Sequence, residues 1–178
     1  IPLMFQFLRR KQRTGGLLAY LGLTEWWEGE LTAEERSAVM ARYQPMGSES
    51  TSLTSGEVLY SSQTPLHFLW GLATWLKGPQ DLLLAQKIFA KGSKLLAESP
   101  VLDVHFFHQG RIEFFYRLRD AHPEARAIAE RACRDQIAIA PQAAKAFIAQ
   151  HDDGLPSHKG FWQLSLIHIS EPTRQAEI

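Results

Sequence analysis

Residues 123–141 read PEARAIAERACRDQIAIAP, and their small and apolar side chains recur at steps of three and four residues. This spacing predicts an amphipathic α-helix with one apolar face. Because most of these side chains are alanine, a neighbouring helix can approach that face closely. The residues of the face are Ala125, Ile128, Ala129, Ala132, Cys133, Ile137 and Ala140.

Prolines divide much of the chain into similar segments. Proline suits the first turn of a helix, where its missing N–H has no partner and its φ angle is already helical. Thr64 and Ser99 precede two of these prolines, where a hydroxyl can accept an orphan backbone N–H. Thr32 and Glu35 have the spacing of a capping box. Six of the nine prolines open a segment with helical spacing: Pro65, Pro79, Pro100, Pro123, Pro141 and Pro156.

The segments differ in how many of their faces are apolar. Residues 84–96 carry a single apolar face. Residues 104–118 carry apolar side chains on more than one face, which predicts a helix buried between two neighbours. Residues 17–27 and 33–43 also read as helices. Trp26 and Trp27 are adjacent on the first of these, so we do not expect both to face one core.

Two stretches between the helices have a different character. Residues 45–56 (PMGSESTSLTSG) are rich in Gly, Ser and Thr and read as a polar loop. Residues 58–60 fit either a short strand or one more helical turn. The chain does not contain several runs of alternating polar and apolar residues bounded by turns, so a sheet is not expected. The sequence therefore predicts an all-α fold.

The helices of the second half are separated by short turns, which predict antiparallel helical hairpins. Predicted starts at 100, 123 and 141 give a two-helix period close to that of helical-repeat arrays. Ala129 and Cys133 take the small and larger positions of a second repeat helix. On these features residues 100–163 resemble a divergent tetratricopeptide-like repeat, within repeat-like hairpins expected over residues 65–163, and an irregular helical bundle is the other arrangement that fits.

The resemblance to tetratricopeptide repeats is incomplete. Gln136 falls where those repeats have alanine, and residues 100–118 lack their Trp-x2-Leu-Gly pattern. Residues 155–164 (LPSHKGFWQL) look like the opening of one more repeat helix. The resemblance implies a scaffold of stacked hairpins and implies no catalytic residue or cofactor.

Residues 164–174 read LSLIHISEPTR and resemble, at every position, the translation of a transposase-based sequencing adapter. We expect residues 164–178 to be a non-native tail and the chain to be a fragment whose native sequence stops near Gln163. In that case Phe161 and Trp162 would lack their normal packing partners. The alternative is a native tail with a short strand over Leu166–Ile169.

The expected organisation has three parts. Residues 1–16 form a basic, flexible N-terminal segment, residues 17–163 form a helical domain, and residues 164–178 form the tail. Within the first part, FLRRKQR (residues 7–13) carries four cations. These could attract anionic lipid or nucleic acid, and a solvated tail is the favoured interpretation.

Composition limits the classes of function. The chain has 178 residues, of which 45% are hydrophobic, and 19 basic residues balance 19 acidic ones. This balance argues against a dedicated nucleic-acid surface. One cysteine cannot form an internal disulfide, so a cytoplasmic location fits best. No apolar run approaches the length of a membrane span.

The strongest metal candidates are histidines in DVHFFH (residues 103–108). His105 and His108 share a helical face, but zinc needs three or four ligands. Asp103 and Glu113 each lie five residues from His108 and point elsewhere, so ordinary polar positions on an apolar helix are the favoured interpretation. We therefore assign no catalytic, cofactor-binding or metal-binding residue.

Other candidates for chemistry are weaker. Cys133 lies in the alanine-rich face, where burial raises a thiol pKa and makes the group inert. Asp152, Asp153 and Gly154 resemble the start of a calcium loop but lack its alternating ligands and final Glu. Glycine-rich phosphate loops and the G-x-S-x-G motif are missing from the sequence.

The leading hypothesis is a non-catalytic helical scaffold that binds another protein or another domain of its full-length chain. The alternative is the helical domain of an enzyme whose catalytic part lies elsewhere or is built around His105, His108 and Glu113. A membrane-surface adaptor that uses residues 4–13 is a third possibility.

Overall fold

We describe the chain from a computed structural model, which covers residues 14–45, 50–150, 155 and 157–175. All regular structure in these residues is helical, so the all-α prediction is confirmed. The α-helices are α1 (Gly16–Tyr20), α2 (Thr24–Gly29), α3 (Ala33–Arg42), α4 (Pro65–Ala73), α5 (Leu82–Ser93), α6 (Val101–Arg117), α7 (Pro123–Ala138), α8 (Ala140–Gln150) and α9 (Lys159–Gln175). Three 3₁₀ turns accompany them: η1 (Ser50–Leu53), η2 (Pro79–Asp81) and η3 (Leu96–Glu98).

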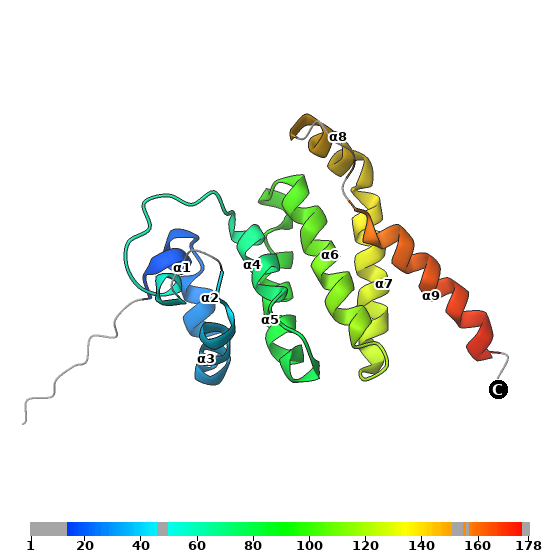
Figure 1. The fold of residues 1–178 in the computed structure, drawn as a ribbon, viewed down its shortest axis with the longest axis horizontal. Coiled ribbons are helices and arrows are strands. Elements are labelled where there is room, and N and C mark those ends of the chain that lie inside the picture. The colour runs from blue at the N-terminus through cyan, green and yellow to red at the C-terminus, as the bar shows by residue number, and fades with distance from the viewer. Residues whose placement is uncertain (1–13, 46–49, 151–154, 156, 176–178) are drawn as a thin grey trace, which may run out of the picture.

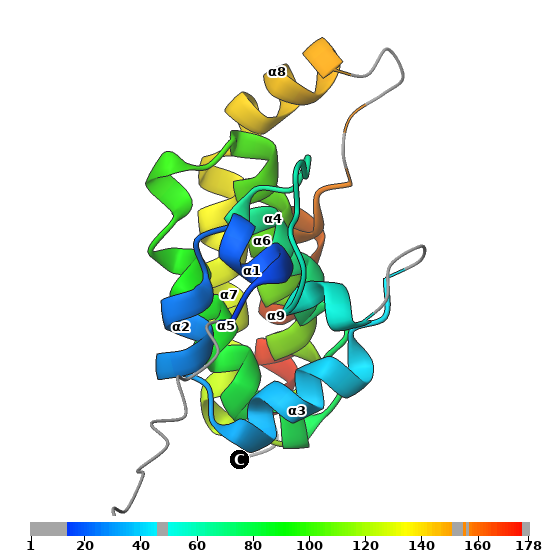
Figure 2. The same ribbon diagram turned by 90° about the vertical axis from the view of Figure 1, so that its left-hand side faces the viewer.

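Helices α4 to α7 form an antiparallel row, with α1 to α3 at one end and α9 at the other (Figure 1). Helix α6 packs between α4 and α7, as its apolar faces predicted. Helix α8 turns away from the row where α7 ends, and the chain returns so that α9 lies against α7. The turned view shows α1, α2 and α3 in front of the hairpin formed by α4 and α5 (Figure 2).

The predicted prolines lie at helix starts wherever the structure describes them. Pro65 and Pro123 are the first residues of α4 and α7. Pro79 begins η2, which leads into α5, and Pro100 directly precedes α6. Pro141 is the second residue of α8. Pro156 falls outside the described residues, as do residues 7–13 and 152–154.

Two of the three predicted caps form. The Thr64 hydroxyl accepts a hydrogen bond from the His67 amide at 3.0 Å, and Thr32 forms a reciprocal capping box with Glu35. The prediction for Ser99 is wrong, because its hydroxyl donates to the Leu95 carbonyl at 2.8 Å. The N-cap of α6 is Pro100 itself, which has no side chain able to cap a helix.

The predicted helix over residues 17–27 is divided into α1 and α2. Gly22 lies between them with a φ of +68°, a left-handed conformation that glycine adopts without strain. The break reorients α2, and both Trp26 and Trp27 are buried in the main core, at 2% and 3% exposure. The expectation that the two tryptophans face different surroundings is therefore wrong: they are adjacent on α2, but after the turn at Gly22 both side chains reach the same core cluster.

Neither interpretation of residues 58–60 is correct, because these residues form no regular structure. Gly15 and Gly16, which end the expected N-terminal segment, are held in the fold: their amides donate to the carbonyls of Thr54 and Gly56 at 2.8 and 3.0 Å. The carbonyl of Ser52 occupies the position that a Cβ on Gly16 would need. Only glycine fits this close contact between α1 and η1.

The main core runs from α1 through α7, and aromatic rings fill its centre. Phe89 on α5 contacts Phe107 and Phe115 on α6, both at ring-centroid distances of 5.6 Å. Gly92 on α5 lets the Phe107 ring approach the helix backbone, because a Cβ there would overlap that ring. This contact brings α5 close to α6.

Ion pairs join the N-terminal helices to α5 and η2. The buried Asp81 carboxylate accepts from Arg42 and from the backbone amides of Lys77 and Gly78, the first of these amides at 2.9 Å. Glu35 pairs with Lys87 at 2.6 Å. Ion pairs as well as core contacts therefore hold α3 against α5 and η2.

Helix α9 continues through position 164 without a break. Leu164 packs against a small cluster of Ile112, Ala132 and Cys133, and Ile167 is buried one turn further along α9. Residues 166–169 are helical, so the short strand of the alternative interpretation does not form. Within the part of the chain described, no helix combines the length and apolar character needed to cross a bilayer.

Candidate functional site

The side chain of His105 lies in the interior, between α6, α7 and the chain that leads into α9. It has 0% exposure, and its Nε2 is 3.2 Å from the carbonyl oxygen of Ser157. Gln136 on α7 donates to the His105 carbonyl at 3.1 Å and accepts from the Gly160 amide at 2.7 Å. The His158 ring packs against the His105 ring, with centroids 5.3 Å apart. His105 thus connects three elements.

His108 has different neighbours, although it is one turn further along α6. Its Nδ1 lies 3.5 Å from the Arg111 guanidinium, which also pairs with Asp135 on α7 at 3.5 Å. Burial, with a smaller contribution from Arg111, lowers the pKa of His108 to about 4. The imidazole is therefore neutral at physiological pH.

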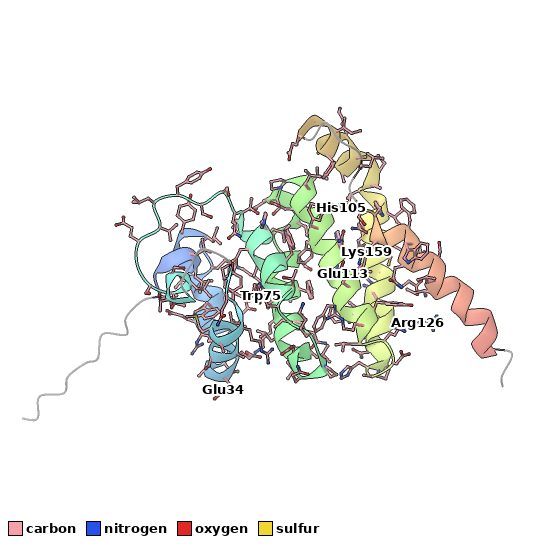
Figure 3. All side chains as sticks on the ribbon, in the orientation of Figure 1. Glu34, Trp75, His105, Glu113, Arg126 and Lys159 are labelled. Atoms are coloured by element: carbon pink, nitrogen blue, oxygen red, sulfur yellow. The ribbon has the colours of Figure 1, made fainter. Side chains whose placement is uncertain are left out.

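Asp103 and Glu113 each have partners of their own. Asp103 accepts from the Thr64 hydroxyl at 2.8 Å and pairs with His67 at 3.4 Å. Burial opposes the charge, but these two hydrogen bonds outweigh burial and lower the carboxyl pKa. Glu113 pairs with Lys159 at 2.9 Å, and Figure 3 shows the two side chains next to each other.

The four candidate ligands are therefore not brought to one point. His108 lines one groove and Glu113 lines a separate small hollow between α4 and α6, while His105 lies among Gln136 and His158. Among the described residues, no three His, Cys, Asp or Glu side chains are arranged to hold a metal ion. The sequence correctly predicted that His105 and His108 lie on one helix. It did not predict that the two histidines contact different residues.

Cys133 is buried in α7, as predicted. Burial raises the pKa of its thiol to about 11, and the nearby Glu130 adds to this effect. Its neighbours in the small cluster are Ile112 of α6 and Ala132 of α7, with Leu164 of α9 packed against them. The thiol is therefore protonated and covered in the folded chain.

A groove that sequence reasoning missed lies at the end of the row where α5 ends, α6 begins and α7 ends. Its volume is about 590 Å³. Exposed Ala97 and Ala138 are among its lining residues, and Ser99, His108 and Asp135 supply its polar side chains. The lining residues are Leu96, Ala97, Ser99, Val101, Val104, His108, Asp135, Ala138 and Ile139.

The groove exists because three helix ends meet without covering one another's apolar residues. Val101 and Val104 are on the first turn of α6, and Ile139 is the single residue between α7 and α8. The sequence contained a sign of this groove, because apolar residues continue past the predicted ends of the helices. Their convergence required the order in which the helices pack.

Comparisons with known proteins add nothing to this geometry: no family model, curated protein or solved structure matches the chain. The groove and the histidine pair are therefore interpreted from their own physical chemistry.

Proposed function

We propose that this chain is a non-catalytic, protein-binding helical domain and that the groove at the α5–α6 and α7–α8 connections receives an amphipathic helix. The partner is another cytoplasmic protein or another domain of the full-length chain. The observation that carries the proposal is the groove itself, an apolar hollow of about 590 Å³. Helix-in-groove recognition uses such surfaces, with apolar anchors spaced three and four residues apart on the bound helix.

The chemistry of the lining favours a helix as the ligand. Ala97 and Ala138 are small, exposed lining residues of the groove, so the backbone of a bound helix can approach the groove closely. His108 is neutral at physiological pH and adds no charge to that floor. The Asp135 carboxylate at the edge pairs with Arg111 inside the domain. The groove therefore offers apolar burial with little cost of removing charge from water.

A second apolar surface lies on α9. Phe161 and Trp162 are 53% and 69% exposed, which is unusual for large aromatic side chains. It is separate from the groove residues. The primary test therefore uses substitutions in the groove, and substitutions on α9 serve as a comparison.

The test is capture of partners by tagged variants, followed by affinity measurement with each purified partner. Ala97→Glu and Ala138→Glu place a carboxylate at the groove without changing a buried residue. Ala127→Glu makes the same change at an exposed position of α7 outside the groove and is the matched control. We expect both groove variants to weaken binding at least about 10-fold, since each buries an unpaired charge in the complex.

Unfolding curves of the three variants must agree with that of the wild type for this comparison to measure binding. Partners that bind all three variants equally would contradict the proposal. Loss of binding by Ala127→Glu as well would also contradict it, because the effect would then not depend on the groove.

A further inference from the structure

The first turn of α9 is attached to the row of helices through a cluster of neutral polar groups. Gly160 donates its amide to Gln136 at 2.7 Å, and Ser157 offers its carbonyl to His105 at 3.2 Å. Gly160 allows this approach: a Cβ there would lie 2.9 Å from the Gln136 oxygen and 3.0 Å from the Cys133 carbonyl. The attachment therefore depends on close contacts that leave no room for extra atoms.

Two imidazoles form the centre of this attachment. The rings of His105 and His158 meet at 5.3 Å with an interplanar angle of 70°. The His158 ring also packs on Phe161, at a centroid distance of 4.5 Å. Nδ1 of His105 and both ring nitrogens of His158 are buried without a hydrogen-bond partner. Each neutral ring therefore has an acceptor nitrogen that would bind a proton more readily if the ring were exposed to water.

We propose that His105 and His158 form a proton-sensitive latch, which holds α9 on α6 and α7 while both rings are neutral and releases it when they take up protons. Two imidazolium ions at this separation repel each other, and among the described residues neither ring has a carboxylate within ion-pairing distance. Burial lowers the pKa of both histidines, and the proximity of His158 lowers that of His105 further. The backbone of Ser157 acts in the opposite direction on His105, as does the backbone of Gln136 on His158, but burial outweighs both effects.

The charged groups around the pair are already matched with one another. On α6 and α7, Arg111 pairs with Asp135, at 3.5 Å. At the start of α9, Lys159 pairs with Glu113 on α6, at 2.9 Å. On the α4 side, His67 pairs with Asp103, at 3.4 Å. In the described part of the chain, no carboxylate lies within ion-pairing distance of His105 or His158.

Release would uncover the small cluster beneath α9. Leu164 would leave the cluster, and Cys133 with Ile112 would become accessible to solvent. Protonation therefore converts a covered helix face into an exposed apolar one. This device is independent of the groove, which lies at helix ends that α9 does not line.

The size of the effect follows from proton binding. A histidine that gains its proton only in the released state multiplies the released population by about 10 between pH 7.5 and pH 5.5, so about 10 per histidine, and about 100 for the pair, is the upper limit of the effect. The direction follows from the lowered pKa of both rings: the latched state binds protons less readily than the released state, so release increases as pH falls. His108 titrates at about 4 and contributes little change to this range.

The test is hydrogen exchange of the full chain between pH 7.5 and pH 5.5, with rates corrected for the intrinsic pH dependence of exchange. We expect the opening constant of residues 159–175 to rise by more than about 3-fold and by up to about 100-fold, while residues 101–117 stay protected. Over the same range, 4,4′-dithiodipyridine, which reacts with thiols in acid, should begin to label Cys133. The wild-type series needs no substitution, so it remains informative if a variant fails to fold.

Two variants separate the latch from general acid sensitivity. His158→Phe keeps a ring against His105 and Phe161 but removes one titrating group, so the rise should be smaller than in the wild type and at most about 10-fold. His67→Gln removes a half-exposed histidine from α4 and should behave like the wild type. A wild-type rise below about 3-fold, an unchanged rise in His158→Phe, or simultaneous loss of protection in residues 101–117 would each overturn the proposal.

Discussion

Removing the neutral, buried imidazole of His108 should flatten the acid dependence of folding. In the folded chain the pKa of His108 is about 4, chiefly because the ring is buried, whereas an unfolded histidine titrates near 6.5. A group with a depressed folded pKa contributes its full stability above the unfolded pKa. That contribution is lost as pH falls from about 6.5 towards 4.

The magnitude can be worked out from the two pKa values. At pH 7 the folded state binds almost no proton and only about a quarter of the unfolded molecules do, so the penalty is about 0.2 kcal/mol. At pH 5 the unfolded state is mostly protonated and the folded state is not, which costs about 2 kcal/mol. Each unit of difference between folded and unfolded pKa corresponds to about 1.4 kcal/mol, so the limit in strong acid is about 3 kcal/mol.

The assay is urea unfolding of the wild type and His108→Gln at pH 7 and pH 5. Glutamine keeps a polar side chain at the groove but has no proton to gain. The difference in unfolding free energy between the two proteins should shift by about 2 kcal/mol in favour of the variant on acidification. Carboxylates and the other histidines titrate in both proteins, so their effects cancel. Equal slopes against pH would refute the reasoning, because the ring would then be solvated when folded.

Four further substitutions, one of them a control, test the packing, an ion pair and a helix cap, each by urea unfolding. Gly92→Ala should destabilise the chain by more than about 2 kcal/mol, because the added methyl group would overlap Phe107. Gly110→Ala is the control and should be neutral or stabilising by up to about 1 kcal/mol, because the nearest atom to its added methyl group is 3.9 Å away. Equal effects of the two substitutions would contradict this packing. Asp81→Asn should cost about 2 kcal/mol above pH 5, with less effect in acid, since three donors hold its carboxylate charged. Thr32→Ala should cost about 1 kcal/mol by removing a capping box, and a change below about 0.3 kcal/mol would show that the cap contributes little.

Local patterns in the sequence were sufficient for the helices and most of their starts. The three- and four-residue spacing, the prolines, and the caps at Thr32 and Thr64 act through contacts within one or two turns. Such contacts can be read from neighbouring residues, so the all-α class and the buried position of α6 followed from the sequence. The burial of Cys133 followed for the same reason.

The sites required contacts between distant residues. His105 meets Ser157 across 52 positions, and Gln136 meets Gly160 across 24. The residue spacing within α6 and α7 does not predict these partners. The groove likewise needs the ends of α5, α6 and α7 to converge, and the shared burial of Trp26 and Trp27 needed the turn at Gly22.

The sequence by itself determined which segments are helical and which face of most helices is apolar, because both properties depend on neighbours along the chain. The tertiary structure alone decided which faces meet and which polar groups are enclosed. Close packing, such as Gly160 against Gln136 and Gly92 against Phe107, selects one arrangement of helices whose apolar faces would allow several.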